Sequence, residues 1–185
     1  MTTDLHKLTQ KQLGELFPII LSPPRHDWPE YFTREAHRIR DILGKEMIKR
    51  IRHVGSTSVL GLTAKPTIDI VVEIAETPGT DQRTIDLMTA GGYEHMQSQK
   101  AHIMVVRGYT PRGMDIPSYH IHLGQPGLPK LEDMIRFRDL LRSDPSVAGA
   151  YETLKENLAA RYRNDREAYT KAKTDFINTN LTKRL

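Results

Sequence analysis

The stretch 51-IRHVGSTSVLGLTAKPTIDIVVEI-74 decides the fold, because two apolar runs flank a loop of small residues at 55–58. The second run, 67–74, is nearly all β-branched or apolar, which predicts a buried central strand. It nevertheless carries Asp69 between two isoleucines. Burying a carboxylate is costly unless it is paired or binds a cation, so Asp69 is the first residue to explain.

The composition is that of an ordinary globular protein, with 185 residues, 38% apolar and 27% charged. This length predicts a single domain over residues 1–185. The absence of cysteine excludes disulfides and cysteine-ligated zinc. Neither a membrane-spanning apolar run nor a secretory signal is apparent, so we expect a cytoplasmic protein. An excess of basic residues between 34 and 52 fits either a solvated helix face or a phosphate-attracting patch.

The order of predicted elements indicates an α+β (mixed α/β) fold with a mixed sheet. A short strand or extended segment at 19–21 comes first, and Asp27 and Gly44 are the expected N-cap and stop of the first helix. Strands are predicted over 48–54, 67–74, 101–109 and 118–124, and helices over 27–43, 80–90, 131–142 and from 146 to 169 or beyond. The turn-rich residues 110–117 should join the last two strands.

Two histidines provide a second candidate for chemistry. Side chains alternate along a strand, so His120 and His122 share one face of the last strand. If this strand lies beside the strand of Asp69, one carboxylate and two imidazoles converge, and both are ligands for a divalent cation. The pattern His-x-His also occurs on half-exposed strands that bind no metal, so both interpretations remain open.

The loop before the Asp69 strand fits two interpretations equally well. Gly55 lets the backbone approach a ligand closely, and the N–H groups and hydroxyls of Ser56 and Thr57 can donate to phosphate oxygens. Lys65 adds a positive charge just before the strand. The same residues also suit a tight turn that caps a helix. No GxxxxGK[ST] or GxGxxG motif is present, which excludes the usual phosphate-binding loops.

The stretch HVGSTSVLGLTAKPTIDIVV closely resembles the signature of the GrpB family, which belongs to the nucleotidyltransferase superfamily. The segments DWPEYF, YHIHL and FRDLLRSDPSVAGAYETLKENLA also match, so the resemblance covers most of the chain. It implies a nucleotidyltransferase-like fold, in which a mixed central sheet is flanked by helices and followed by a C-terminal helical pair.

The resemblance also implies roles for individual residues. In active members of the superfamily, a Gly-Ser loop holds the nucleotide phosphates, and a carboxylate-x-carboxylate pair on the next strand binds Mg²⁺. Gly55 and Ser56 match the loop, and Asp69 matches the first carboxylate. The second carboxylate position holds Val71, which departs from the pattern. Glu73 lies on the same strand face but one pleat repeat too far to replace it.

Two hypotheses follow. The protein is a metal-dependent enzyme that transfers a nucleotidyl group from a nucleoside triphosphate to an unidentified small acceptor, or a non-catalytic nucleotide- or phosphate-binding module. Nucleic acid and membranes are not expected partners. The enzyme hypothesis assigns catalysis to Asp69 and Lys65, phosphate binding to Gly55, Ser56, Thr57, Lys65 and Arg107, and a divalent metal to Asp69, His120 and His122. The expected metal is Mg²⁺ or Mn²⁺, with Zn²⁺ as an option through the two histidines.

Overall fold

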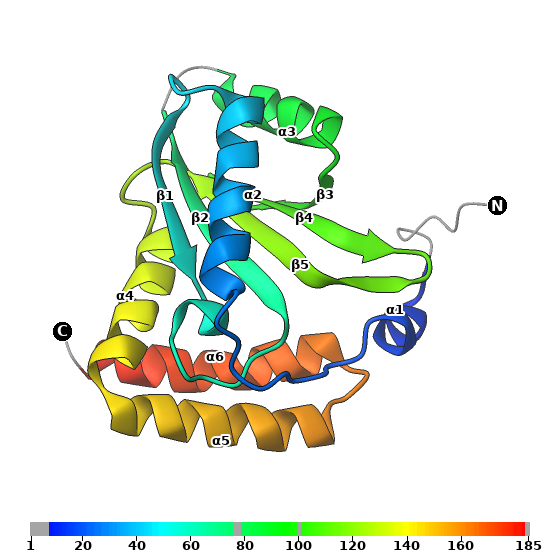
Figure 1. The fold of residues 1–185 in the computed structure, drawn as a ribbon, viewed down its shortest axis with the longest axis vertical. Coiled ribbons are helices and arrows are strands. Elements are labelled where there is room, and N and C mark those ends of the chain that lie inside the picture. Colours follow the sequence, from blue (N-terminus) through cyan, green and yellow to red (C-terminus); the bar gives the residue numbers. More distant parts are fainter. Residues whose placement is uncertain (1–7, 76–78, 100, 184–185) are drawn as a thin grey trace.

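The structure of the protein is a computed structural model that describes residues 8–75, 79–99 and 101–183. Helices and all five strands occupy the first two thirds of the chain, and helices alone follow (Figure 1). The elements are α1 (Gln10–Leu16), α2 (Trp28–Leu43), β1 (Ile48–Val54), the 3₁₀ turn η2 (Ser56–Ser58), β2 (Thr67–Ile74), α3 (Thr80–Ala90), β3 (Glu94–Gln99), β4 (His102–Thr110), β5 (Gly113–Gly124), α4 (Pro129–Ser143), α5 (Pro145–Arg161) and α6 (Arg166–Thr182).

The five strands form one mixed sheet in the order β1-β2-β5-β4-β3. Strands β2 and β5 are parallel, whereas the other neighbouring pairs are antiparallel. The expected mixed α+β class is therefore confirmed, as is the placement of the β1, β2 and β5 segments in one sheet. The β2–β5 register sets Asp69 directly opposite His120 and Val71 opposite His122. The carboxylate and the histidines thus share one face.

The two faces of the sheet differ in what covers them. The face that carries Ile68, Ile70 and Ile121, here called the core face, packs into the largest apolar cluster. Trp28 and Ile39 of α2 belong to the same cluster, and α2 lies across the sheet in Figure 1. Because Val71 on the other face is buried as well, β2 reads as a nearly continuous apolar run, whereas β5 does not.

The opposite face, which carries Asp69, His120 and His122, is here called the cavity face. Helix α4 covers one part of it, where Leu131 packs on Val54 and Val71. Helices α5 and α6 run side by side across one end of the sheet (Figure 1). Together the three helices enclose a second apolar cluster with the loop that follows η2.

The C-terminal helices differ from the expected pair. One helix was predicted from residue 146 through Tyr169, but α5 ends at Arg161 and α6 begins at Arg166. The physical reason is local capping: the Asp165 side chain accepts a hydrogen bond from the backbone N–H of Ala168 and starts a new helix. Because the chain reverses here, α6 returns toward the sheet and contributes to the cavity face.

Several smaller expectations also need correction. Residues 19–21 form no strand, and the nearest pairing is an isolated bridge between Ser22 and Ala64. Residues 113–117, expected in a turn, belong to β5. Asp27 precedes α2 as expected, but its carboxylate pairs with Arg25 and makes no capping hydrogen bond. Strand β3 and helix α1 were not predicted, because their sequences are polar and short.

The helices of the described residues do not have the properties of a membrane-spanning segment. Across residues 8–75, 79–99 and 101–183, none is long and apolar enough to cross a membrane.

Candidate functional site

A cavity of about 490 Å³ lies on the cavity face of the sheet, where the loop after β1 meets β2, β5 and the C-terminal helices. Asp69, His120 and His122 line it from the sheet, and Gly55, Ser56 and Thr57 line it from the loop. Helices α4, α5 and α6 contribute Lys130, Lys155 and Lys173, and Lys65 precedes β2. The sequence-predicted residues, with the exception of Arg107, therefore come together around one space.

Asp69 and the two histidines form a compact group at the sheet. One ligand atom from each of these three residues lies within 4.8 Å of the others. The Oδ1 atom of Asp69 is 3.3 Å from Nδ1 of His120, and the Asp69 side chain is 26% exposed. The group therefore faces the cavity and offers one oxygen and two nitrogens to a cation.

Each histidine is held by a further contact from β4. Nε2 of His120 lies 2.6 Å from the hydroxyl oxygen of Tyr109. Arg166 of α6 donates a hydrogen bond to the same hydroxyl oxygen at 3.1 Å. Nδ1 of His122 lies 3.2 Å from Nε2 of His102. These contacts fix both rings and leave one nitrogen of each ring for the interior of the group.

Burial and charge shift the pKa values of this group in a consistent way. Burial tends to raise the pKa of Asp69, but the His120 hydrogen bond and the neighbouring positive charges outweigh it and hold the pKa below its ordinary value. Burial lowers the pKa of His120, against the opposing effect of Asp69. Burial also lowers the pKa of His122 to about 3. Near neutral pH the group is therefore one carboxylate with two neutral imidazoles, the protonation state that metal binding requires.

Gly55 is required by both its conformation and its surroundings. Its backbone has φ 68° and ψ −175°, a combination that essentially only glycine adopts. A Cβ atom at this position would lie 2.2 Å from Oδ2 of Asp69. The loop therefore packs its backbone directly against the carboxylate, as a ligand-binding loop must do if both groups contact the same molecule.

Two of the loop hydroxyls have different surroundings. Oγ1 of Thr57 donates a hydrogen bond to the carbonyl of Thr67 and lies 3.1 Å from Nε2 of His53. The hydroxyl therefore ties the loop to β2, while Thr57 also lines the cavity, and its contact with phosphate stays a prediction. Ser56 is partly exposed at the cavity and accepts a hydrogen bond from Nζ of Lys155 at 3.4 Å.

The lysines of α5 and α6 were missed from the sequence. Each lies four residues after a tyrosine and above that tyrosine's ring: Lys155 is 5.1 Å from the ring centroid of Tyr151, and Lys173 is 4.4 Å from that of Tyr169. Lys65 approaches the ring of Tyr169 as well, at 5.6 Å. The repeated pattern Tyr-x-x-x-Lys in YETLK and YTKAK was the available signal.

Burial weakens the proton affinity of these ammonium groups. It lowers the pKa of Lys155 and of Lys173 to about 8 each, and nearby Arg166 adds to the effect on Lys173. Burial, together with Arg166 and Lys173, holds the pKa of Lys65 well below its usual value. The cavity thus brings together basic groups whose protonated forms are destabilised by burial and by mutual repulsion. An anionic ligand would relieve that repulsion.

Arg107, expected to bind phosphate here, lies instead on the core face. Its guanidinium forms an ion pair with buried Glu35 of α2 and lies 4.6 Å from the ring centroid of Tyr119. The hydroxyl of Tyr93 donates a hydrogen bond to the same carboxylate at 2.6 Å. The assignment of Arg107 to the phosphate site is therefore wrong, because its strand position turns it away from the cavity.

The second carboxylate of the superfamily pattern has no replacement in the described part of the cavity wall. Val71 is fully buried against α4. Glu73, one pleat further along β2, pairs with Arg50 at 2.9 Å and does not line the cavity. The space beside Val71 is taken by His122, its partner in the β2–β5 register. The sheet thus offers one carboxylate and two imidazoles to the cavity.

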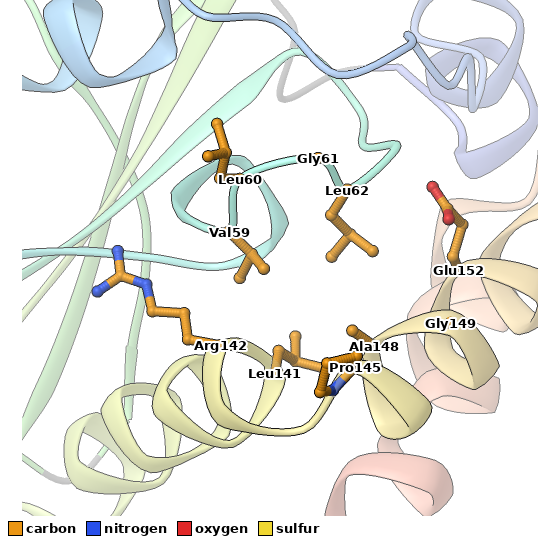
Figure 2. A pocket seen from close by; sticks show the side chains of 10 residues that line it. All are labelled: Val59, Leu60, Gly61, Leu62, Leu141, Arg142, Pro145, Ala148, Gly149 and Glu152. Atoms are coloured by element: carbon orange, nitrogen blue, oxygen red, sulfur yellow. The ribbon is translucent and has the colours of Figure 1, made fainter.

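A separate hollow of about 370 Å³ lies at the α4–α5 junction, away from these groups (Figure 2). Val59 and Leu62 point from the loop toward the two helices (Figure 2). Its two charged residues already serve the loop backbone: Arg142 donates to the carbonyl of Ser58, and Glu152 accepts from the N–H of Thr63. The hollow therefore anchors the loop and offers no chemistry of its own.

Comparison with solved structures identifies the fold as that of the nucleotidyltransferases. A structure of Cid1, described as having RNA terminal uridylyl transferase activity, aligns with a TM-score of 0.50 at 16% identity and covers 76% of this chain and 42% of that chain. The crystal structure of GrpB from Enterococcus faecalis aligns with a TM-score of 0.69 at 27% identity, over 88% of this chain and 99% of that one.

The chain belongs to the GrpB family, since residues 18–183 match the family described as GrpB protein. Among its relatives, the UPF0157 protein SCO7215 of Streptomyces coelicolor is 36% identical over 163 residues, which cover 88% of this chain and 82% of that protein. The UPF0157 protein YqkA of Bacillus subtilis is 33% identical over 152 residues. This match covers 82% of the present chain but only 43% of YqkA.

Proposed function

We propose that this protein transfers a nucleotidyl group from a nucleoside triphosphate to a small acceptor, in a reaction that depends on a divalent cation. One observation carries the proposal: a single cavity brings together the Gly55 loop, the Asp69 carboxylate and four lysines. A triphosphate needs this combination, because its oxygens require both N–H donors and positive charge, and its reacting phosphorus requires a fixed position.

The lysines supply the phosphate-binding charge. Lys65 approaches from the loop before β2, and Lys155 and Lys173 approach from two different helices, so the three can surround an extended anion. The rings of Tyr151 and Tyr169 hold the ammonium groups of Lys155 and Lys173 in place. In the transition state, Lys65 is placed to neutralise negative charge that develops on the phosphoryl oxygens.

Asp69, His120 and His122 fit one divalent cation, because they offer a carboxylate oxygen and two neutral imidazole nitrogens within 4.8 Å of one another. A cation bound there would supply charge neutralisation at the triphosphate. The residues do not fit the oxygen-rich pair of Mg²⁺ ions that the superfamily pattern implies, since Val71 replaces the second carboxylate.

A smaller hollow of about 180 Å³ adjoins the cavity and gives room for a nucleoside. The two spaces share the loop residues Gly55 and Ser56, as well as Tyr151. Phe137 offers an apolar wall and Asn178 an amide that can donate and accept. The shared wall supports a nucleotide that places its phosphates over the loop and its base between α4 and α6.

The structural neighbours support a nucleoside triphosphate as the ligand to test first. A second Cid1 structure, at 14% identity and with a TM-score of 0.50, is described as a poly(U) polymerase with Mg and 3'-dATP bound. That similarity concerns the fold, so the base, the acceptor and the chemistry of the present protein rest on its own residues.

The alternative is a binding module that keeps the nucleotide cavity without catalysing transfer. Val71 favours it, because two-metal phosphoryl transfer needs several oxygen ligands around the ions. The retained Asp69 and the convergent lysines favour the enzyme. Burying charged groups destabilises the fold, and such groups are typical of catalytic sites.

Titration calorimetry with the four ribonucleoside triphosphates and a divalent cation tests the proposal first. Binding of a triphosphate, weakened by Ser56→Trp with the fold intact, supports the cavity as a nucleotide site. Transfer is then followed with triphosphates labelled at the α-phosphate, in mixtures of candidate small acceptors. Triphosphate binding without release of pyrophosphate would establish the binding module, and absence of triphosphate binding by the parent protein would overturn both hypotheses.

A further inference from the structure

The disagreement between the donor set and Mg²⁺ leads to a second proposal, which rests on the proposed site. We propose that Asp69, His120 and His122 select a nitrogen-preferring divalent ion such as Zn²⁺, Co²⁺ or Fe²⁺ over Mg²⁺, and that His102 and Tyr109 are positioning residues for the two imidazoles. The proposal concerns which cation the protein holds and what holds the ligands, and therefore goes beyond the transfer reaction.

The first argument is the chemistry of the ligands. Mg²⁺ takes oxygen ligands in near-ideal octahedral geometry and retains several waters. Imidazole suits zinc, iron, copper and nickel, and three protein ligands with an open position are typical of catalytic zinc and non-haem iron sites. Two histidines and one carboxylate, with atoms within 4.8 Å of one another, therefore match the second class.

The second argument is the way in which each ring is oriented. Metal-binding histidines nearly always use their other ring nitrogen in a hydrogen bond that fixes the tautomer and the ring plane. His120 makes such a contact with Tyr109 at 2.6 Å, and His122 makes one with His102 at 3.2 Å. Both supporting residues come from β4, the neighbour of β5, so one strand positions both ligands of the next.

The third argument concerns the burial of the histidines and the access of a cation to the group. The rings of His102 and His122 are stacked, with centroids 5.4 Å apart and 8° between their planes, and both side chains are largely buried. His102 therefore holds the ring of His122 from the buried side of the group. Asp69 keeps 26% of its side chain exposed, so a hydrated cation can reach the group from the cavity.

The arrangement also predicts the tautomers. If His122 binds the cation through Nε2, its Nδ1–H must donate to Nε2 of His102, which therefore acts as an acceptor. An amide oxygen can replace that acceptor, whereas an aliphatic side chain cannot. His102→Gln should therefore preserve cation binding, because its Oε1 extends about as far as Nε2 of the histidine, and His102→Leu should weaken it about 10-fold or more, the usual effect of losing such a supporting contact.

The experiment uses the full chain after chelator treatment and follows binding of Co²⁺ by visible absorption, which reports the ligand geometry directly. We expect saturable 1:1 binding, displacement by Zn²⁺ and no displacement by a large excess of Mg²⁺. His122→Ala should abolish the spectrum. Tyr109→Phe should weaken binding by about 10-fold while retaining all three ligands. His37→Ala, which alters an exposed histidine on α2, should leave Co²⁺ binding unchanged.

Several outcomes would overturn the inference. Mg²⁺ competing with Co²⁺ on equal terms would show that oxygen ligands dominate. Equal Co²⁺ affinity of the parent protein and His122→Ala would show that the histidines are packed rather than coordinating. Circular dichroism and thermal unfolding separate these results from loss of fold, and His102→Gln remains informative if His102→Leu does not fold.

The inference and the proposed function can fail independently. Triphosphate binding in Mg²⁺ alone, with no Co²⁺ spectrum, would sustain the nucleotide site and overturn the metal choice. A Co²⁺ spectrum that requires His122, in a protein that binds no triphosphate, would establish the metal site and overturn the proposed function.

Discussion

Each face of the central sheet has a carboxylate beside a basic residue, but the two carboxylates differ in how far they are buried and paired. On the core face, Glu35 is 2% exposed, forms an ion pair with Arg107 and accepts a hydrogen bond from Tyr93. On the cavity face, Asp69 is 26% exposed, and its Oδ1 lies 3.3 Å from Nδ1 of His120, whose imidazole is neutral near neutral pH. The nearby Lys65 faces the same cavity.

This difference separates a structural charge from a functional one. A carboxylate that serves the fold is saturated with donors, because an unpaired buried charge costs several kcal/mol by any estimate. A carboxylate that serves a ligand keeps an open side and one weak partner that the ligand can replace. Both side chains are carboxylates, each beside an apolar residue in the sequence, so their surroundings in the fold distinguish them.

Removing the partner of Glu35 should have the largest effect. Arg107→Ala leaves Glu35 buried with Tyr93, and breaking such a pair costs about 3 kcal/mol, at the lower end because Arg107 is one-third exposed. Urea unfolding measures this loss. Nucleotide affinity of the folded variant should equal that of the parent protein.

A surface pair provides the control for that measurement. Arg34 contacts Glu30 on the exposed side of α2, so Arg34→Ala should change stability by less than about 0.5 kcal/mol. If Arg107→Ala instead weakens nucleotide binding with little loss of stability, its original assignment to the phosphate site is restored.

Asp69→Asn should show the reverse pattern. The amide is nearly isosteric and loses the charge of the ligand, so affinity for the divalent cation and any nucleotidyl transfer should fall by at least about tenfold. The free energy of unfolding should change little, because few donors depend on the carboxylate. Cation titration and urea unfolding of the same samples make the comparison.

Asp41→Asn on the exposed surface of α2 is the matched control, and should affect neither quantity. A large loss of stability in Asp69→Asn, with cation affinity intact, would make Asp69 a structural residue like Glu35 and remove the distinction between the two faces.

The cavity face could be anticipated from sequence because strand alternation is a local rule. The period of two placed Asp69 on one face of β2 and both histidines on one face of β5, and the register brought the two faces together. The same rule applied to β4 separates His102 from Arg107, but it does not say which face of β4 meets the cavity. That depends on pairing with β5, which local sequence does not encode.

The contribution of α5 and α6 could not be anticipated for a related reason. Lys173 reaches the cavity because the chain turns between Arg161 and Arg166 and sends α6 back toward the sheet, whereas Lys155 reaches it from α5, before that turn. A helix predicted to continue through Tyr169 would have carried that residue away from the site. Because the end of α5 was predicted several residues too late, Lys173 was not recognised as a cavity residue.

Gly55→Ala should produce a smaller but selective effect. The substitution strains a positive φ and places a Cβ 2.2 Å from Oδ2 of Asp69, so the carboxylate must move. We expect a loss of about 1 kcal/mol from the backbone term, and a marked loss of cation and nucleotide affinity from the displaced carboxylate. Calorimetry and urea unfolding give the two quantities.

Gly61→Ala isolates the backbone term. Gly61 has φ 79°, and a Cβ there would meet no atom within 4 Å. It should therefore lose a similar amount of stability while retaining affinity. Equal affinity losses in the two variants would mean that loop conformation, rather than contact with Asp69, governs binding.

The smallest expected effect is a pH dependence of triphosphate binding that arises from Lys155 and Lys173. Burial lowers the pKa of Lys155 and of Lys173 to about 8, although Glu152 and Glu156 oppose the shift at Lys155 and Asp69 opposes it at Lys173. Only the protonated ammonium attracts phosphate, and the bound anion in turn favours the proton. Affinity should therefore be fully present below the folded pKa and should fall as pH rises through about 8.

Lys155→Arg tests the origin of that slope, because a guanidinium remains charged throughout the range. Calorimetry at about pH 7, 8 and 9 and constant ionic strength should show a severalfold loss of affinity in the parent protein and a shallower loss in this variant. Ionisation of the triphosphate itself is common to both and cancels in the comparison. Lys45→Arg, on the exposed turn before β1, should keep the parent slope. An identical slope in Lys155→Arg would mean that the ammonium group of Lys155 does not contact the phosphates. The lysines of the C-terminal helices would then serve a ligand other than a triphosphate.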